Sequence, residues 1–495
     1  MKVGNQMAMT NFVKRIQDVM RNDAGVNGDA QRIEQIVWIL FLKIYDAKEE
    51  LWELYNEDYK SIIPENLKWR NWAVDEKDGE ALTGDELLRF VNNELFPTLK
   101  NLEIDENTPM SQVIVRYAFE DANNYQKDGV LLRQVINIID GIDFTEYEER
   151  HAFGGIYESF LKELQSAGNA GEFYTPRAVT DFMVQVIKPK LGEKIGDFAC
   201  GTGGFLVSAL NELEKQVGSS LEDRETYSNS IYGIEKKGLP HILAVTNMLL
   251  HDIDNPHIIH GNSLEIDYKD YRKMEKFDVI LMNPPYGGSE KDSVKVNFPM
   301  DLRSSETADL FMSVIMFRLK KEGRCGIILP DGFLFGTDNA KINIKKKLLS
   351  EFNLHTIVRL PHSVFAPYTS ITTNILFFDN TKPTEEIWFY RVDMPEGYKN
   401  FSKTRPMKLE HFENAFNWWD NREEIEVDGF PKAKKYCLKE IEERNYNIDL
   451  CGIPHKEEII LDPNDLILEY QEKRASLNDE IDNLLEKITS MLGGK

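Results

Sequence analysis

Between residues 150 and 380, short apolar runs alternate with stretches of helical periodicity, and this alternation constrains the fold more than any other feature of the chain. The apolar runs, which we expect to be strands, are 194–199, 230–235, 257–261, 277–282, 324–330, 355–360 and 373–378. This pattern is typical of a doubly wound α/β sheet. Such a sheet binds its ligand beyond the carboxyl ends of the strands, near the switch in strand order.

The regions before and after the predicted sheet have a different pattern of apolar residues. The first 150 residues are predicted to be helical, because Ile33, Ile36, Leu40, Ile44 and similar residues recur at helical spacing. We therefore expect an N-terminal helical domain (1–150), a sheet domain (151–380), an irregular or mixed connecting region (381–463) and a helical tail (464–495). The tail has a short coiled-coil seam, which could pair with a partner helix or fold back on its own protein.

The charge and the cysteines limit the function. The chain has 59 basic and 83 acidic residues, a net charge of −24, which disfavours a large basic surface for gripping nucleic acid unaided. Its four cysteines are scattered and form no CxxC pair, which argues against a disulfide framework or a zinc site and suits a reducing cytosol. The longest apolar run, 36–42, is too short to span a membrane. We expect a cytoplasmic protein without a metal site.

The first predicted strand continues into DFACGTGGF, residues 197–205. Small residues let the backbone approach a ligand closely, and the following helix offers unpaired N–H groups to an anion. A dinucleotide loop does not fit. With Gly201 and Gly203 as the first two glycines of GxGxxG, the third position is Leu206, and the next acidic strand end, Glu235, lies 34 positions after Gly201. The dinucleotide fingerprint expects about 20, and a P-loop is excluded because no Gly-Lys-Ser/Thr follows.

S-adenosylmethionine, which carries no phosphate, could bind to the same glycine loop and acidic strand end. Its carboxylate would lie at the glycine loop and the helix N-terminus, and Glu235 would accept hydrogen bonds from both ribose hydroxyls. Because short glycine motifs match freely, a purely structural strand-to-helix turn stays an alternative for the loop taken alone.

LMNPPYGG, residues 281–288, follows another predicted strand, so it shares a crevice with the glycine loop. The amino group of adenine is a poor nucleophile, because its lone pair is delocalised, and it needs two acceptors for its two hydrogens. The Asn283 side-chain oxygen can be one, and the Pro284 carbonyl, whose direction the diproline fixes, can be the other. Tyr286 can stack on an extruded base. The turn therefore predicts in-line methyl transfer from a sulfonium to an amine, without a metal.

Taken together, these motifs resemble those of N6-adenine DNA methyltransferases, and most specifically of the modification subunits of type I restriction–modification systems. The segments that carry the resemblance, in the family's order, are GEFYTPR (171–177), DFACGTGGF (197–205), GIE (233–235), GNSL (261–264), MNPPYG (282–287), ADLFM (308–312), LPDGFLFG (329–336), PYTSITTNILFF (367–378) and FSKTRPMKLEHF (401–412). The resemblance covers almost the whole chain. It implies a Rossmann-like, S-adenosylmethionine-dependent methyltransferase sheet with an N-terminal helical domain and a C-terminal helical tail.

The resemblance also implies which residues form the site. The implied catalytic residues are Asn283, Pro284, Pro285 and Tyr286. The implied cofactor residues are Glu172, Phe173, Tyr174, Thr175, Pro176, Arg177, Asp197, Gly201, Thr202, Gly203, Gly204, Glu235 and Asn262, the last standing where many relatives have aspartate. Asp309 and Leu310 match a motif on the cofactor side, with a turn of a sheet-packing helix as the alternative. Phe365 is a candidate second ring for the base, although a core aromatic is the favoured interpretation.

In that family, a separate specificity subunit reads the DNA sequence, two modification subunits clasp the target, and a restriction subunit can join. The resemblance implies that this chain methylates N6 of adenine in double-stranded DNA, as an adenine-specific, site-specific methyltransferase. Its partners would be double-stranded DNA and the specificity subunit, which agrees with the acidic balance.

Three other functions stay open. A stand-alone adenine methyltransferase has little room, because only about 115 residues follow the predicted sheet. A non-catalytic assembly subunit is disfavoured by the intact residues 283–286. Methylation of RNA or of a protein amide is disfavoured by the helical N-terminal zone and the tail.

Overall fold

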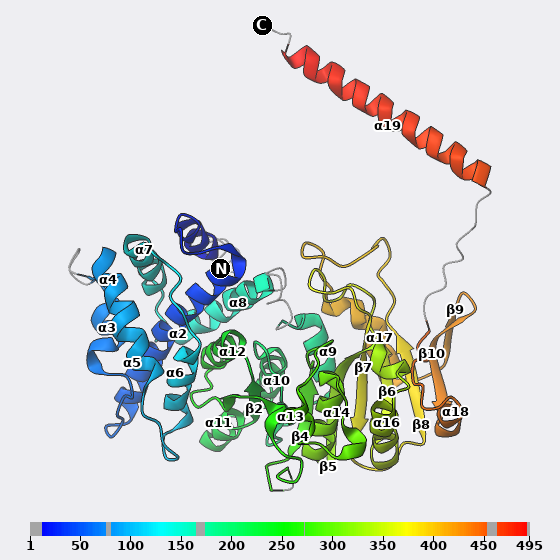
Figure 1. Cartoon of the computed structure of the whole chain (residues 1–495), viewed down its shortest axis with the longest axis horizontal. Helices are drawn as coiled ribbons and strands as arrows, with labels where there is room; N and C mark the ends of the chain where they lie inside the picture. The colour runs from blue at the N-terminus through cyan, green and yellow to red at the C-terminus, as the bar shows by residue number, and fades with distance from the viewer. Residues whose placement is uncertain (1–11, 76–80, 165–173, 272, 453–462, 493–495) are drawn as a thin grey trace. The chain divides into compact units, whose positions relative to one another are not determined.

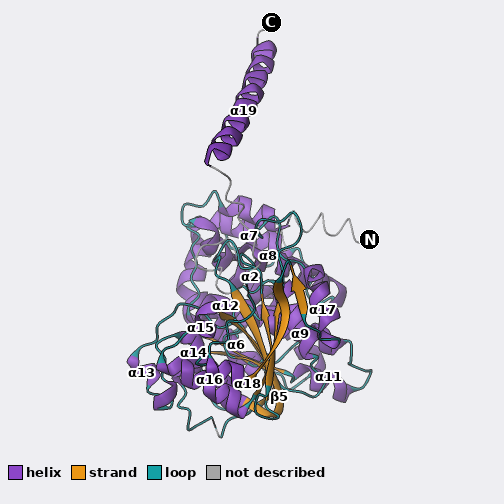
Figure 2. Ribbon diagram, turned by 90° about the vertical axis from the view of Figure 1, so that its right-hand side faces the viewer, coloured by secondary structure: helices purple, strands orange, loops and turns teal. Residues whose placement is uncertain are grey.

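The computed structural model describes residues 12–75, 81–164, 174–271, 273–452 and 463–492. The chain divides into two compact units, residues 1–452 and residues 453–495. The first unit contains a helical N-terminal part and one mixed sheet with helices on both faces (Figure 1; Figure 2). The α/β class predicted from the sequence is therefore confirmed.

The sheet has ten strands in the order β3-β2-β1-β4-β5-β7-β6-β8-β10-β9. The strands are β1 (Ile195–Asp197), β2 (Ile231–Glu235), β3 (Ile258–His260), β4 (Phe277–Met282), β5 (Leu319–Pro330), β6 (Asn353–Arg359), β7 (Thr373–Asp379), β8 (Glu386–Arg391), β9 (Ile425–Val427) and β10 (Phe430–Cys437). The first seven overlap the seven strands expected from the sequence. The chain builds outward from β1 through β2 to β3 and then returns to the other side of β1 with β4, so the switch point lies between β1 and β4.

Strand direction decides which loops share an edge of the sheet. β1 to β5 run parallel to one another, and β7 lies antiparallel between β5 and β6. β6 therefore runs in the same direction as β5, and β8 pairs parallel with β6. As a result, the ends of β6 at Arg359 and of β8 at Arg391 lie at the same edge as the end of β4 at Met282.

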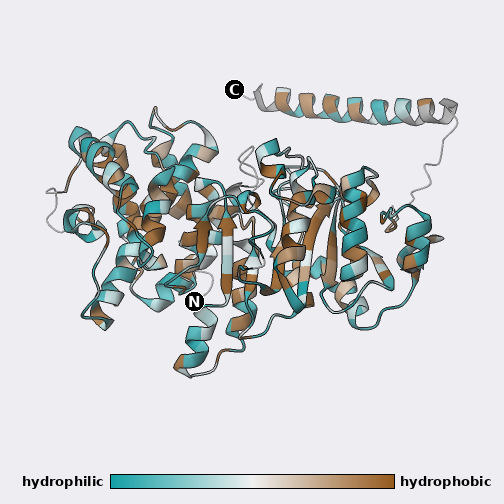
Figure 3. Ribbon diagram, turned by 60° about the horizontal axis from the view of Figure 1, so that its bottom comes forward, coloured by the Kyte–Doolittle hydropathy of each residue, from teal (hydrophilic) through white to brown (hydrophobic). Residues whose placement is uncertain are grey.

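Side chains alternate between the two faces of the sheet, as the period of a strand requires. Along β4, Val279 and Leu281 join one buried cluster, whereas Ile280 and Met282 join the other. The first cluster is covered by α9 (Arg177–Ile187), α10 (Gly204–Glu214), α12 (Gly238–Leu250) and α17 (Glu413–Asp420), and the second by α14 (Thr307–Arg318), α16 (Asn339–Glu351) and α18 (Leu438–Glu443). Figure 3 shows that strands between these helices are largely hydrophobic, in brown. Burial on both faces explains why these strands are nearly continuous apolar runs.

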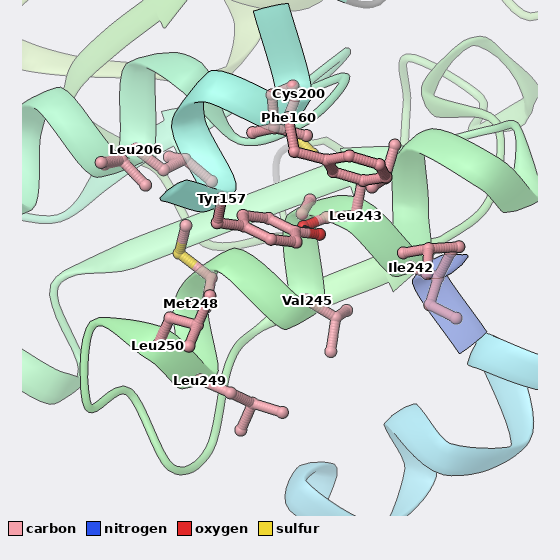
Figure 4. Close-up of a cluster of buried hydrophobic side chains, with 14 of the residues drawn as sticks. Tyr157, Phe160, Cys200, Leu206, Ile242, Leu243, Val245, Met248, Leu249 and Leu250 are labelled. Carbon is pink, nitrogen blue, oxygen red and sulfur yellow. Dashed lines mark hydrogen bonds between the residues drawn. The ribbon is translucent and has the colours of Figure 1, made fainter. Parts of the chain in front are cut away.

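The N-terminal part is helical, as its periodicity predicts. Its helices are α2 (Gly28–Tyr55), α3 (Trp69–Trp72), α4 (Gly84–Phe90), α5 (Phe96–Lys100), α6 (Met110–Glu120), α7 (Gly129–Asp140) and α8 (Tyr147–Leu164). It shares the first buried cluster with the sheet. Figure 4 shows Tyr157 and Phe160 of α8 packed against Leu243 and Met248 of α12, and the Tyr157 hydroxyl donates to the Leu243 carbonyl at 3.0 Å.

Beyond β8, in the region expected to be irregular or mixed, β9 and β10 extend the sheet. β10 contains Lys432, Lys434 and Lys435, and only Ala433 is buried along it, so the apolar alternation that reveals a strand is missing. In the second unit, α19 (Pro463–Leu492) forms the predicted helical tail, with Leu477, Ile481, Leu484 and Ile488 at seam spacing. Within the described residues, no helix is long and apolar enough to cross a membrane.

Candidate active site

A cavity of about 270 Å³ opens at the switch point, beyond the carboxyl ends of β1, β2 and β4. The predicted site residues that line it are Thr175, Asp197, Gly201, Gly204, Glu235, Asn262, Asn283, Pro285 and Tyr286. The structure therefore brings the glycine loop and the 283–286 turn, about 80 residues apart in the sequence, into the walls of one cavity.

The glycine loop is shaped by two left-handed residues. Gly201 has φ 54° and Gly203 has φ 79°, in the left-handed backbone region that residues other than glycine rarely adopt. Gly203 also packs closely, since a Cβ there would meet the Met248 side chain at 3.2 Å. Thr202 is buried and its carbonyl accepts from Asn247 at 3.2 Å, so Thr202 and Gly203 shape the loop and do not line the cavity.

Glu235, the last residue of β2, is held by two backbone donors. Its Oε2 accepts from the Gly201 N–H at 3.0 Å, and its Oε1 accepts from the Lys237 N–H at 2.8 Å. The residue is 7% exposed, and burial raises the pKa of its carboxyl against the opposing effect of these hydrogen bonds. Each carboxylate oxygen has two lone pairs, so each can still accept a hydrogen bond from a ligand in the cavity.

Asp197 differs from Glu235, because few groups around its carboxyl stabilise a negative charge. It is 1% exposed, and it accepts a hydrogen bond from the Ala199 N–H at 3.2 Å. Burial raises the pKa of this carboxyl to about 8, and the nearby Glu235 charge adds to the shift while the Ala199 hydrogen bond opposes it. A cation bound in the cavity would supply the charge that this carboxyl lacks.

The 283–286 turn begins directly after β4. Asn283 donates through Nδ2 to Thr175 Oγ1 at 3.0 Å, and its Oδ1 accepts from the Tyr286 hydroxyl. Pro284 is buried and does not line the cavity, whereas Pro285 is exposed and does. Burial raises the pKa of Tyr286, and Tyr368 raises it further. The Asn283 side-chain oxygen, which is predicted to accept a hydrogen bond from the target amine, thus already accepts one from Tyr286 in the same turn.

The segment before α9 ties three parts of the molecule together. Glu172 and Phe173 lie outside the described residues. Glu158 of α8 accepts from the Tyr174 hydroxyl at 2.8 Å and from the Arg177 guanidinium at 2.6 Å. Arg177 also donates to the Gly204 carbonyl. Tyr174, Arg177 and Pro176 do not line the cavity, whereas Thr175 does, and Arg177 supports the glycine loop through Gly204.

Asn262 lines the cavity at the turn after β3. It caps the short helix η4 (Ser263–Glu265), with Oδ1 accepting from the Leu264 N–H and Nδ2 donating to Glu265, both at 3.1 Å. Next to it, the Ser263 hydroxyl donates to the Phe198 carbonyl at 2.6 Å, which joins this turn to the end of β1.

Asp309, Leu310 and Phe365 are not among the residues that line the cavity. The Asp309 carboxylate accepts from Ser304 at 2.6 Å and pairs with Lys341 at 3.1 Å. Leu310 is buried in the core. Phe365 is also a buried core residue, which was the favoured interpretation.

Sequence reasoning missed several lining residues. These are Phe198, Ala199, Cys200, Phe205, Lys236, Lys237, Gly261, Ser263, Leu264, Gly288, Glu290, Thr307 and Phe311. Most of them directly follow a strand end or neighbour a motif residue, which is a signal the sequence does contain. Thr307 and Phe311 come from α14, the helix of the Asp309 motif, and only the three-dimensional fold shows which of its sides faces the cavity. Within the described residues, no cluster of three or more His, Cys, Asp or Glu side chains could hold a metal ion, and all four cysteines are free.

The sheet order, the glycine loop and the acidic end of β2 define a Rossmann-like methyltransferase. Comparison with known proteins narrows this class. Residues 148–458 match the N-6 DNA Methylase family model, and residues 9–139 match the model of the HsdM N-terminal domain. The chain belongs to the N-6 DNA methylase family, among the methylase subunits of type I restriction enzymes.

Individual relatives agree over nearly the full length. The chain is 49% identical to the type I restriction enzyme EcoEI methylase subunit of Escherichia coli, over 99% of each chain. A crystal structure of a modification subunit from Vibrio vulnificus YJ016 is 40% identical, with a TM-score of 0.76 over 92% of this chain and 98% of the other. A chain from a structural study of type I R-M complex assembly is 34% identical, with a TM-score of 0.79 over 97% of this chain and 98% of the other.

Proposed function

We propose that this chain transfers a methyl group from S-adenosylmethionine to N6 of adenine in double-stranded DNA, as the modification subunit of a type I restriction–modification complex. The observation that carries the proposal is the single cavity shared by the glycine loop and the Asn283 turn. Membership of the N-6 DNA methylase family supports the same reaction.

The residues of the cavity fit S-adenosylmethionine. Glu235 offers an oriented carboxylate for the two ribose hydroxyls, and the start of α10 offers N–H groups to a carboxylate. Asp197 is a buried carboxyl in need of a cation, and the ligand carries an ammonium and a sulfonium. When bound, S-adenosylmethionine supplies the electrophilic methyl group. Within the N-terminal segment, Thr175 is the residue that would border it.

The 283–286 turn fits an amine that must be held still. The Asn283 oxygen can accept one hydrogen of the adenine amino group once the Tyr286 hydroxyl releases it. Within the described residues, no hydrogen bond uses the Pro284 carbonyl, which leaves it available for the second hydrogen. Tyr286 would then stack on the extruded base. Positioning and hydrogen bonding would supply most of the catalysis.

The family also indicates the partners of this chain. A separate specificity subunit would choose the DNA sequence, with two copies of this chain on each specificity subunit, and a restriction subunit can join in that family. The helical residues 1–150 and the tail 464–495 would be the partner-binding parts of a chain that also contains the methyltransferase domain (151–380) and the connecting region (381–463). The complex would work in the cytoplasm, where its DNA substrate lies.

The test is methyl transfer by the reconstituted complex. The chain and its specificity subunit are incubated with methyl-labelled S-adenosylmethionine and duplex DNA, and the digested nucleosides are separated. We expect the label in N6-methyladenosine. Label in cytosine, RNA or protein would contradict the proposal, and equal transfer by the chain alone would favour a stand-alone enzyme.

A further inference from the structure

One segment of this acidic chain is strongly basic. Residues 399–408, here called the basic turn, contain Lys399, Lys403, Arg405 and Lys408 and no acidic residue, whereas the whole chain has 59 basic and 83 acidic residues. All four side chains are exposed. The nearest acidic residues in the sequence, Glu396 and Glu410, flank the turn, and Glu410 pairs with Lys408 at 3.2 Å.

The conformation of the basic turn is held by hydrogen bonds and by buried side chains. At its tip, Ser402 and Arg405 exchange two backbone hydrogen bonds, of 3.0 and 3.1 Å, so that Lys403 and Thr404 form the apex. At its base, Phe401 and Met407 are buried. The Arg405 guanidinium lies over the Tyr398 ring at 4.9 Å, which fixes its position and leaves its edge for an outside acceptor.

Strand direction places the basic turn at the edge of the sheet that carries the active site. It follows β8, whose carboxyl end lies at the same edge as that of β4, where Asn283 begins. It also docks on the loop after β6. His362 bonds to the Lys399 carbonyl at 3.2 Å, and Ser363 Oγ accepts from the Phe401 N–H at 2.9 Å. The segment between β8 and α17 extends past the strand ends (Figure 1).

The same loop after β6 packs near the target side of the cavity, since its Val364 and Phe365 belong to the buried cluster against which Tyr286 packs. The loop also carries Tyr368, which adds to the rise in the pKa of Tyr286. A basic element that docks on the loop near Tyr286, the residue that would stack on the base, is well placed for the backbone on either side of an extruded adenine. Backbone phosphates are the acceptors that such a surface fits, because lysine and arginine recognise phosphate by charge and by N–H donation.

We propose that the basic turn, through Lys399, Lys403 and Arg405, binds the phosphodiester backbone of DNA beside the adenine that enters the cavity. This inference rests on the proposed function and names the surface through which an acidic subunit contacts its DNA. The contact positions the duplex and does not read its sequence. It leaves cofactor binding untouched, because no residue of the turn lines the cavity.

The test measures the salt dependence of DNA binding. The full-length chain, and separately its complex with the specificity subunit, is titrated with a labelled duplex of arbitrary sequence over a range of salt concentrations. Each phosphate contact that is lost reduces the slope of log K against log salt by about 0.9. We expect the triple variant Lys399→Ala/Lys403→Ala/Arg405→Ala to lower the slope by about 2 to 3 and to bind the cofactor normally.

The matched control removes three other exposed lysines, Lys321, Lys382 and Lys439, which lie at the opposite edge of the sheet. Its net charge equals that of the triple variant, so it separates a local contact from a general charge effect. The single reversal Lys403→Glu, at the apex, should weaken binding without disturbing the fold.

Several results would overturn the proposal. These are absence of DNA binding by the wild type at low salt, an unchanged slope in the triple variant, or an equal loss in the control. A triple variant that keeps DNA binding but no longer associates with the specificity subunit would show a protein contact instead. Failure of the proposed function would show differently, as absence of methyl transfer by the wild-type complex.

Discussion

The two halves of the cavity differ in how their acceptor groups are held. On the cofactor side, Glu235 is fixed by the backbone N–H groups of Gly201 and Lys237. On the target side, the Asn283 oxygen is engaged by the Tyr286 hydroxyl, a side-chain donor that can rotate away. A backbone-held carboxylate is ready before the ligand arrives, whereas the target side must exchange one hydrogen bond for another. We therefore infer a preformed cofactor site and a target site that the entering adenine completes.

The largest effect is expected from Asn283→Ala. This change removes the acceptor that orients the amine, so methyl transfer in single turnovers should fall by about 100- to 1,000-fold, the usual cost of losing one transition-state hydrogen bond. The affinity for S-adenosylmethionine, measured by calorimetry, should stay within a factor of about two. The neutral Asn283 amide lies on the target side of the cavity, and a net hydrogen bond to a neutral group contributes little to cofactor binding. Transfer at the parental rate would remove Asn283 from the mechanism.

The matched change on the cofactor side is Glu235→Ala. It removes the carboxylate that would accept the ribose hydroxyls, so the dissociation constant of S-adenosylmethionine should rise by about 10- to 100-fold, or roughly 1.5–3 kcal/mol for hydrogen bonds to a charged group. Glu235→Gln keeps the shape and should recover part of the loss. The comparison of the two halves breaks down if Glu235→Ala binds the cofactor as the wild type does.

Cofactor affinity should also depend on pH through Asp197. Its pKa in the free protein is raised to about 8, and a cationic ligand favours the ionised carboxyl, so binding below that pH must release a proton. Affinity should therefore rise between pH 6 and pH 8, by up to about tenfold per unit. In Asp197→Asn the same titration should be flat over this range. A slope that persists in Asp197→Asn would assign the proton to another group.

The smallest effect is expected from Tyr286→Phe, which keeps the ring and removes the hydroxyl that engages Asn283. Because the adenine no longer competes with that hydroxyl, KM for DNA should fall by about two- to tenfold, or 0.5–1.5 kcal/mol. Tyr286→Ala also removes the stacking surface and should raise KM instead. If the Phe and Ala variants are equally impaired, the hydroxyl is needed in the target-bound state.

Parts of the molecule that are buried on two faces could be predicted from the sequence. β1, β2, β4 and the second half of β5 are largely apolar because both of their faces are covered, and the glycine loop and the 283–286 turn stand at the ends of such strands. Once the strands are known, the rule for ligand position in doubly wound sheets brings these two motifs into one cavity.

Other parts could not be predicted because their signal depends on distant contacts. β10 is an exposed strand with charged residues, so it lacks the apolar alternation. Tyr174 and Arg177 belong to a recognisable motif, yet only the folded chain shows that Glu158 of α8 holds both of them. Likewise, Asp309 has the right neighbours in the sequence, but only the folded chain shows that its carboxylate pairs with Lys341 and does not line the cavity.

The most direct test of the shared cavity is a crystal structure of the chain with S-adenosylmethionine bound. The account predicts the ribose hydroxyls on Glu235, the ammonium near Asp197, and the sulfonium methyl directed at Asn283. A cofactor bound outside this cavity, or one whose methyl group points away from Asn283, would contradict it.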